Sequence, residues 1–513
     1  TTMSGFGYDV LGFGSGAGVA GPEVDEDFNR VAFLSHFDGA NNGDNNAFDD
    51  GSSSNHTVTA SGDVTQGSFG PFARPDGEWG VAYNQSGNDY FAVPDSTDFN
   101  VASGADWTLE FWGYYNNLSA NNQIVDTRPN GSNGFYFTAA VDTNKKVYFF
   151  TNSGYRITTA AAINLGEWVH IAFVRSSGTL KIYINGTADN NTYSDSNTYI
   201  SGDWWIGTRQ SSAGSWTYGS MSNFRFVNGT AVYTSNFTPS SSALTAITNT
   251  KLLTFQSNRF VDNSASAHTI TPAGDVSVSA FGAILTDAVY DPAVNGASAY
   301  FDGASDYLRC DAALDSFTAT SSVTTIDGWF YWNGKTSSFE AIVACNAAAN
   351  GSNEMVLSVQ PDGTFEVRYA QDGIGNDHFT MGSVNKNQWN FFSVQFNNGS
   401  NAFQIFLNGS SVLTKANALN VYLSNCTFLI GTEADGANAG SLGNWWSGYF
   451  SDIRVSNNAR SASVPTSSFS SDGNTKLLLN MADGQAIDST AQNNLLLYGG
   501  AKLSTGQAKF GDT

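Results

Sequence analysis

The stretch 167-EWVHIAFVRSSGTLKIYINGT-187 contains two short segments in which apolar and polar residues alternate. In its second half, Leu180, Ile182 and Ile184 fall on one side of an extended chain, while the residues between them fall on the other. The Asn-Gly pair at 185–186 follows at once, and both residue types accept the positive φ angles of a tight hairpin turn. The stretch therefore predicts a β-hairpin with one buried face.

The same pattern returns in the second half of the chain as 388-QWNFFSVQFNNGSNAFQIFLNGS-410. Three further segments recur in the same order: 107–117 with 324–334, 204–208 with 428–432, and 219–229 with 448–458. One unit of about 220 residues thus occurs twice. Tryptophans recur within the strands of both copies, and we expect them to pack in the cores: Trp112, Trp168, Trp329 and Trp389.

A second, shorter element occurs three times, at residues 33–70, 251–282 and 476–511. We therefore divide the chain into a Gly-rich arm (1–25), a first domain (26–250) and a second domain (251–513). Residues 476–513 either cap the array or begin a third copy. The expected fold class is all-β, with tandem antiparallel β-sandwiches after the arm.

Composition excludes several classes of partner. The net charge of −23 repels nucleic acids and anionic membrane surfaces, and no apolar run approaches the ~20 residues that span a bilayer. We expect neither nucleic-acid binding nor membrane insertion. Three cysteines, all in the second half, do not suggest a disulfide framework.

The ordered motifs resemble a known family. F-D-G-x-x-D-Y (301–307), the paired W and I-x-x-N-G segments, I-G and G-x-x-x-D-x-R (448–454) are similar to concanavalin A-like, laminin-G-like jelly-roll domains. The combination of LSHFDG (34–39) and HTVTASGDVTQGSFGPF (56–72) with RFVNGTAVYTSNFTP (225–239) resembles multi-domain virion proteins of tailed bacteriophages of marine bacteria and cyanobacteria. This resemblance implies a tail fibre or other virion appendage, and a location on the virion surface.

The residues do not indicate an enzyme. The glucanases that share the jelly-roll scaffold carry E-x-D-x-x-E on one strand, because they need a paired acid and nucleophile. Here Glu110 stands alone in its strand, with Asp327 at the matching place in the repeat. No histidine is spaced with a Ser or Cys as in a catalytic triad. We therefore expect a non-enzymatic protein, and glycosidase activity is not favoured.

Aromatic residues in two Gly-rich turns, 213–219 and 442–448, are the candidates for ligand contact, since loops at a sandwich rim often carry function. These residues are Trp216, Tyr218, Trp445 and Trp446. Because Trp216 and Trp445 recur, a structural position at the sandwich rim is preferred for them over ligand contact, whereas Trp446 lacks a counterpart and is the stronger candidate for glycan contact. The resemblance also implies a Ca²⁺ ion near Asp452, with Asp302 as a neighbour and Asn223 at the equivalent place in the first domain.

These observations favour a structural or adhesion protein of a tailed-phage virion. Its domains would contact host-surface glycans or neighbouring subunits, and residues 1–25 would contact other virion proteins. Homo-oligomers would strengthen weak glycan contacts through avidity. A secreted or cell-surface bacterial lectin-like adhesin and a purely architectural spacer remain the alternatives.

Overall fold

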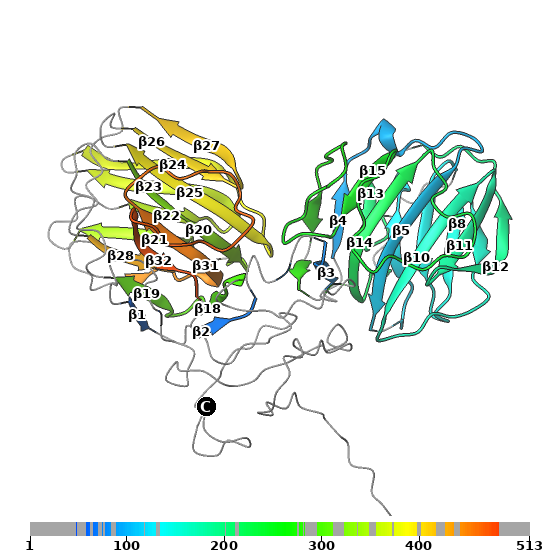
Figure 1. Ribbon diagram of the computed structural model, residues 1–513, viewed down its shortest axis with the longest axis horizontal. Helices are drawn as coiled ribbons and strands as arrows, with labels where there is room; N and C mark the ends of the chain where they lie inside the picture. The colour runs from blue at the N-terminus through cyan, green and yellow to red at the C-terminus, as the bar shows by residue number, and fades with distance from the viewer. Residues whose placement is uncertain are drawn as a thin grey trace, which may run out of the picture.

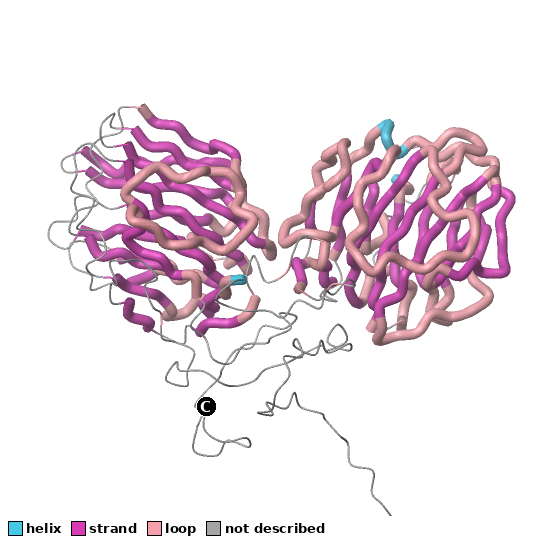
Figure 2. The backbone as a smooth tube through the Cα atoms, viewed as in Figure 1, coloured by secondary structure: helices cyan, strands magenta, loops and turns pink. Residues whose placement is uncertain are grey.

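The protein is described from a computed structural model, in which nearly every ordered element is a β-strand (Figure 2). The described residues are 48, 58–61, 65–69, 74 and 77–481, apart from the gaps at 84–88, 117, 130–133, 201, 211–214, 274–275, 281, 283–294, 311–322, 336, 348–354, 372–373, 398–401, 417–425 and 435–441. The strands gather into two bodies that lie side by side (Figure 1). The predicted arm, residues 1–25, lies outside the described residues.

The first sandwich consists of two antiparallel sheets. One sheet has the order β12 (Thr187–Ser194), β11 (Thr179–Ile184), β10 (Trp168–Ser176), β5 (Trp107–Tyr115), β14 (Gly219–Asn228), β3 (Gly80–Tyr83) and β17 (Ser277–Ser279), with β15 (Thr250–Thr254) also paired to β14. The other has the order β16 (Thr271–Ala273), β4 (Tyr90–Val93), β13 (Trp204–Ile206), β6 (Asn122–Asp126), β7 (Phe137–Val141), β8 (Val147–Thr151) and β9 (Gly154–Thr158). A 3-10 turn, η2 (Thr97–Phe99), follows β4.

The second sandwich repeats this plan strand for strand. Its first sheet has the order β27 (Ser410–Lys415), β26 (Ala402–Leu407), β25 (Trp389–Asn397), β20 (Val323–Trp332), β31 (Ser447–Ser456), β18 (Ser298–Asp302) and β2 (Thr65–Gly67), with β32 (Thr475–Leu479) on β31. Its second sheet has the order β1 (Val58–Ser61), β19 (Tyr307–Cys310), β28 (Cys426–Ile430), β21 (Glu340–Ala347), β22 (Met355–Val359), β23 (Thr364–Gln371) and β24 (Ile374–Ser383). A small hairpin, β29 (Glu433–Ala434) with β30 (Leu442–Gly443), lies apart.

Local details repeat as well. The predicted hairpin turns are confirmed: Asn185 and Gly186 have φ angles of 48° and 76°, and Asn408 and Gly409 have 49° and 80°. The pairing of β14 with β15 contains a bulge before its last residue pair, and the pairing of β31 with β32 contains a bulge at the same place. The structure thus confirms an all-β fold of two antiparallel sandwiches built on one plan.

The predicted positions of the tryptophans need correction. Trp112 and Trp168 are half-buried, and their neighbours on the same strands, not they, point between the sheets. Trp329 and Trp389 are 1% and 0% exposed, but they belong to the hydrophobic cluster of the first sandwich, against which their sheet packs. The period of two explains the error, because an apolar ring on a strand can face either the core or an outer neighbour.

The aromatic junction between the two sandwiches centres on Phe69. Its ring lies 5.2 Å from Tyr331, 5.7 Å from Trp389 and 6.4 Å from Trp79, measured between centroids. The backbone N–H of Trp389 also donates to the Asn258 carbonyl across the junction. The aromatic rings on one sheet of the second sandwich are therefore covered by Phe69, which precedes the first sandwich in the sequence, and by residues of the first sandwich itself.

The predicted domain boundaries also change. The second domain was expected to open at residue 251, but β15, β16 and β17 complete the first sandwich. Residues 58–67, which we expected in the first domain, form β1 and β2 on the second sandwich (Figure 1). The repeated element supplies edge strands, so its position in the sequence does not show which sandwich it completes. Of the possible third copy, β32 pairs with β31, and residues 482–513 lie outside the described part.

Candidate functional site

A carboxylate and an arginine recur as a pair on one face of each sandwich. Glu110 accepts hydrogen bonds from Arg225 Nε at 2.9 Å and Nη2 at 2.5 Å, and Asp327 accepts from Arg454 at 3.0 and 2.6 Å. Each pair links two adjacent strands, β5 with β14 and β20 with β31. Neither arginine belongs to a hydrophobic core cluster, but Arg225 is covered and only 5% exposed. Recurrence and burial mark both pairs as structural.

The two carboxylates differ in whether their hydrogen bonds and neighbouring charges outweigh the effect of burial on the pKa. Burial raises the pKa of Glu110, but hydrogen bonding with His170 at 3.2 Å, the Arg225 charge and the Tyr233 hydroxyl at 2.7 Å outweigh it, so the pKa lies below its usual value. Burial of Asp327 outweighs the contribution of Arg454, so its pKa is raised. Glu110 is thus held ionised among three donors.

The Trp-bearing turns have a clear structural role. Each ends in a glycine at the start of the next strand, Gly219 with φ 147° and Gly448 with φ 141°. A Cβ atom on Gly219 would lie 1.8 Å from the Tyr114 carbonyl oxygen, and one on Gly448 would lie 1.9 Å from that of Tyr331. The strand can approach its neighbour this closely only where no side chain intervenes.

The prediction that Trp446 contacts a ligand is wrong. Its ring is 0% exposed and packs in the core of the second sandwich, 5.5 Å from Phe330 and 5.0 Å from Phe450. Thr217, the residue at the equivalent place, is also buried. The residue at this position is buried in both copies. The presence of Trp in one copy and Thr in the other therefore reflects how each core is packed, and not contact with a ligand.

The other three predicted ligand residues are half-buried. Trp216 forms an isolated bridge with Thr208, and the Tyr218 backbone N–H donates to Asn122 Oδ1 at 2.6 Å. The Trp445 ring lies 5.9 Å from that of Tyr307. These rings keep partial exposure at the sandwich rim, and their contact with a ligand stays a prediction.

The residues predicted to hold calcium do not form a site. Asp452 is fully buried, and its oxygens already accept from the Ser468 hydroxyl at 2.6 Å, the Phe469 N–H at 2.8 Å and the Ser451 hydroxyl at 2.9 Å. Asp302 is exposed and lies five residues away along the strand pairing, opposite Ser447. This donor set does not fit a calcium ion.

Asn223, at the equivalent place in the first sandwich, accepts from the Leu244 N–H and donates to the Gly77 carbonyl. Both Asn223 and Asp452 adopt positive φ angles, 52° and 48°, at a bulge in their strands. Their shared role is to tie a following segment to the sheet. Within the described ranges, no three acidic, His or Cys side chains gather as a metal site.

An exposed aromatic cluster on the first sandwich was not predicted from the sequence. Tyr155 is 66% exposed, and its ring meets Tyr148 edge-on at 5.0 Å and Phe150 at 5.3 Å. Phe135, which precedes β7, is 60% exposed, and its carbonyl accepts from the N–H of Ile200, itself 41% exposed. We call three residues the aromatic platform: the exposed Tyr155, the Tyr148 ring on which it packs, which is 6% exposed, and the half-buried Phe150. Tyr155, Phe135 and Ile200 are three of the four large apolar side chains that are exposed in the described part of the chain.

Local sequence explains how the platform is held. Asn152 and Ser153 join β8 to β9, with φ angles of 47° and 61°, as in the tight turn that matches the twist of a hairpin. The Arg156 guanidinium donates from Nη2 to the Asn152 carbonyl at 2.6 Å and from Nε to the Thr151 carbonyl at 3.1 Å. The turn beneath Tyr155 is therefore fixed before any ligand arrives.

Polar groups border the rings. The Arg128 guanidinium lies 5.1 Å from the centre of the Phe150 ring and is paired with Asp126 at 2.8 Å. The Asn121 amide lies 3.4 Å from the Tyr148 hydroxyl. Burial raises the pKa of Tyr148 to about 12, so this hydroxyl stays protonated and can both donate and accept. Apolar rings beside fixed donors and acceptors can stack on, and hydrogen-bond to, a small polar ligand.

The second sandwich has no such cluster among its described residues. Phe149 and Val367 occupy equivalent core positions on β8 and β23, and the outward neighbours of Val367 are Glu366 and Arg368. Arg368 pairs with Glu433 at 2.9 Å. The two sandwiches share their buried residues and differ on this outer face.

The sequence does contain a signal for the platform. The segment 147-VYFFT-151 is apolar on both faces of the strand, whereas the matching segment 365-FEVRY-369 is apolar on one face. Comparing outward positions between the two copies would have singled out Tyr148 and Phe150. The pattern of one copy alone does not show whether an outer aromatic is covered or exposed.

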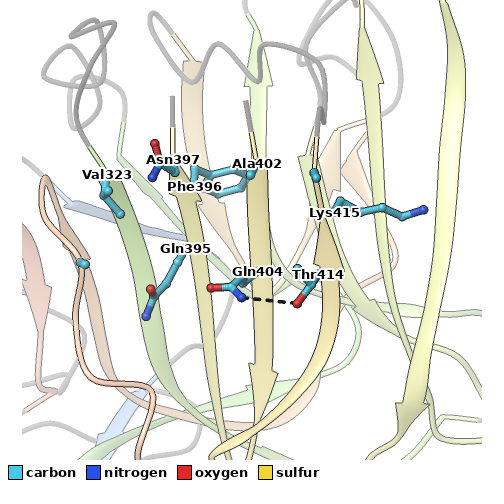
Figure 3. Close-up of a pocket in the computed structure, with 10 residues that line it drawn as sticks. Val323, Gln395, Phe396, Asn397, Ala402, Gln404, Thr414 and Lys415 are labelled. Atoms are coloured by element: carbon cyan, nitrogen blue, oxygen red, sulfur yellow. Dashed lines mark hydrogen bonds between the residues drawn. The ribbon is translucent and has the colours of Figure 1, made fainter. Parts of the chain in front are cut away.

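A hollow of about 300 Å³ on the second sandwich is a weaker candidate (Figure 3). It lies across β25, β26 and β27, near the ends of these strands (Figure 3). Gln404 donates to Thr414 at 3.4 Å, and Gln395 donates to the Arg460 carbonyl at 2.7 Å. Phe396 is only 5% exposed, so the hollow offers little aromatic surface for stacking. Its lining residues are Val323, Gln395, Phe396, Asn397, Ala402, Gln404, Thr414, Lys415, Ala416 and Ala459.

No helix in the described ranges has the length and apolar character needed to cross a membrane.

Comparison with known proteins identifies the family. The model of the concanavalin A-like lectin/glucanases superfamily (laminin G type) matches residues 85–244 and 302–464. No curated protein matches the chain. A heptameric SAP-like pentraxin of Limulus polyphemus is 13% identical, with a TM-score of 0.27, covering 40% of this chain and 94% of its own.

Domains LG4–5 of the mouse laminin α1 chain are 11% identical, with a TM-score of 0.25, covering 77% of this chain and 96% of that one. The CBM40 module of the Ruminococcus gnavus IT-sialidase, in a structure with α2,3-sialyllactose, is 12% identical, with a TM-score of 0.25, and covers 28% of this chain and 80% of its own. The two family matches coincide with the two sandwiches and span more than half of the sequence. The chain therefore belongs to the concanavalin A-like lectin/glucanase superfamily, with two laminin-G-like domains in tandem.

Proposed function

We propose that the protein is a non-enzymatic carbohydrate-binding protein and that its first sandwich binds glycans through the aromatic platform. The observation that carries this proposal is the exposed Tyr155 ring, held edge-on to Tyr148 and Phe150 over a fixed hairpin turn. A sugar ring has an apolar C–H face and a rim of hydroxyls. It can stack on Tyr155 while the amide of the half-buried Asn121 contacts its rim.

The test is binding of the full chain to an array of glycans. We expect wild type to bind a subset of them and Tyr155→Ala to lose at least tenfold in affinity, because the substitution removes the stacking surface. Ile247→Ala is the matched control, since Ile247 is 39% exposed but lies outside the platform. The proposal fails if wild type binds no glycan, or if Tyr155→Ala and Ile247→Ala bind as wild type does.

We further propose that this protein is a component of a tailed-phage virion, displayed on the particle surface, with host-cell glycans as its ligands. Support comes from the sequence motifs LSHFDG, HTVTASGDVTQGSFGPF and RFVNGTAVYTSNFTP alone. Residues 1–25 would then contact other virion proteins. Antibodies against the chain, visualised on purified particles, test this location: labelled appendages support it. Particles without the chain would favour the secreted or cell-surface adhesin.

The architectural spacer is the remaining alternative, and the glycan array separates it from the others. A spacer requires no exposed aromatic surface, so it predicts that replacing Tyr155 leaves every interaction of the protein unchanged. Loss of glycan binding on that substitution would exclude it.

A further inference from the structure

A row of polar side chains crosses the hollow on the second sandwich (Figure 3). Gln395 on β25 lies directly opposite Gln404 on β26, and Gln404 lies directly opposite Thr414 on β27, so the three side chains share one face of the sheet. Gln404 and Thr414 are exposed, and Gln395 is half-buried. The residues on either side of Gln404 in its strand, Phe403 and Ile405, belong to the core instead. The row therefore presents two carboxamides and a hydroxyl on the outer face.

These groups are held in place but keep much of their hydrogen-bonding capacity. Gln404 donates to Thr414 over 3.4 Å, and Gln395 donates to the Arg460 carbonyl at 2.7 Å. In the part of the chain that the structure describes, the side-chain oxygen of neither glutamine accepts a hydrogen bond. A carboxamide carries an acceptor and donors side by side. Adjacent hydroxyls of a sugar ring also donate and accept, so they match the groups in this row.

The first sandwich covers the equivalent face with its own chain. Val174 stands at the place of Gln395, and it is 1% exposed. It belongs to a small buried cluster, against which Tyr233 and Phe237 pack. These two rings stack on each other in parallel, with an angle of 5° between their planes. At this place, the first sandwich is apolar and closed.

The segment that provides this cover differs between the two copies. After β14 it reads 230-TAVYTSNFTP-239, and after β31 it reads 459-ARSASVPT-466, which is shorter and contains no aromatic residue. Ala459 of the second copy lines the hollow. Where one sandwich covers the face with aromatic rings, the other leaves a polar surface open.

The surroundings of the row exclude several kinds of ligand. Among the lining residues that the structure describes, none is acidic and only Lys415 is basic. Its ammonium lies 3.8 Å from the centre of the Phe379 ring, and its side chain extends away from the two glutamines (Figure 3). β25 and β26 are paired on both sides, so a peptide cannot add to them as a further strand. Because Phe396 is buried, stacking contributes little, and recognition must depend on hydrogen bonds.

We propose that the hollow is a second binding site, which holds an uncharged sugar unit through hydrogen bonds from Gln395, Gln404 and Thr414. Its volume of about 300 Å³ is at the lower end of the range for small-molecule sites. The hollow and the aromatic platform lie on different sandwiches, so either can bind without the other. The chain would then contact glycans by stacking on its first sandwich and by hydrogen bonds on its second.

Saturation-transfer NMR on the full chain tests this site, with the methyl glycosides of glucose, galactose and mannose as probes. Measurements in the Tyr155→Ala background remove the contribution of the platform. We expect this chain to bind at least one of the probes, and added Gln404→Leu to raise the Kd about tenfold, the loss expected for about two hydrogen bonds. Thr414→Val, which removes one hydroxyl and keeps the shape of the side chain, should raise the Kd by a smaller factor.

Asn190→Leu is the matched control, because Asn190 is an exposed amide on β12, the strand of the first sandwich equivalent to β27. The proposal is overturned if the Tyr155→Ala chain binds none of these glycosides, or if Gln404→Leu and Asn190→Leu leave the same Kd. Binding that Tyr155→Ala abolishes and Gln404→Leu leaves intact would support the platform and refute the hollow. The reverse pattern would support the hollow and count against the platform.

Discussion

Asp452 offers a sharp test of the link between pH and stability, because its buried carboxyl is better suited to the protonated form. Burial raises its pKa to about 6 from an ordinary value of 3.8, and the three hydrogen bonds it accepts do not compensate. The Ser451 hydroxyl has one proton, yet it lies 2.5 Å from the Ala297 carbonyl and 2.9 Å from Asp452 Oδ2. A protonated Asp452 can donate to Ser451 while Ser451 donates to Ala297, which satisfies every group.

The sign follows from linkage. A carboxyl whose pKa is raised on folding stabilises the folded state fully below pH 3.8, and this stabilisation is lost as the pH rises through 6. The difference between the two pKa values corresponds to about 3 kcal/mol at neutral pH. Asp452→Asn supplies a neutral donor and acceptor at every pH. We therefore expect this variant to gain up to about 3 kcal/mol in the free energy of unfolding at pH 7.5 and nothing at pH 3.5.

The first sandwich already has a neutral amide, Asn223, at the place equivalent to Asp452. The Asn223 amide donates to Ser222, and Ser222 donates to the Trp79 carbonyl, so the amide takes the place of the protonated carboxyl. The assay is urea unfolding of the full chain between pH 3.5 and 7.5, with Asn223→Asp as the reverse substitution. Asn223→Asp should lose stability as the pH rises. If Asp452→Asn is less stable than wild type at pH 7.5, or keeps the dependence on pH between 4 and 6, the reasoning is refuted.

Three further substitutions test the structural assignments. Glu110→Gln should cost about 3–5 kcal/mol, since it leaves the buried Arg225 without its partner charge, and urea unfolding measures this loss. Trp446→Ala should cost about 3–5 kcal/mol through the cavity it creates, while glycan binding by the first sandwich stays unchanged; an unaltered unfolding midpoint would contradict the buried position. Gly448→Ala should destabilise the second sandwich, whereas Gly443→Ala, which meets no atom within 4 Å, should not; equal unfolding midpoints for the two would contradict the close approach of the strands.

The sequence predicted the elements that depend on local chemistry. Strand periodicity located the hairpins, and Asn185-Gly186 and Asn408-Gly409 adopt the positive φ angles that their residue types favour. The tandem repeat predicted two sandwiches of one plan, as the sheet orders confirm. The turns depend on residues adjacent in sequence, and the repeat depends on comparing two segments of the sequence. Both can therefore be predicted without knowledge of the tertiary structure.

Assignments that depend on long-range pairing could not be made in this way. A strand of four residues such as 58–61 has the same alternation whichever sheet it joins, so its place on the second sandwich depends on which edge it meets. Trp446 and Trp445 are adjacent in sequence, yet one ring is buried in the core and the other is half-buried beside Tyr307. An aromatic-rich turn alone does not show which ring faces outward.

The recurrence of a residue proved a better guide to structure than to function. Glu110 with Arg225 and Asp327 with Arg454 occupy equivalent places and connect strands in both sandwiches. Divergence marks the opposite case: Tyr148 and Phe150 flank a shared core position at which the second sandwich presents Glu366 and Arg368. Two copies of one fold need the same core, whereas their outer faces are constrained only by what they contact. A ligand specific to the first sandwich is therefore sought where the copies differ, at the platform around Tyr155.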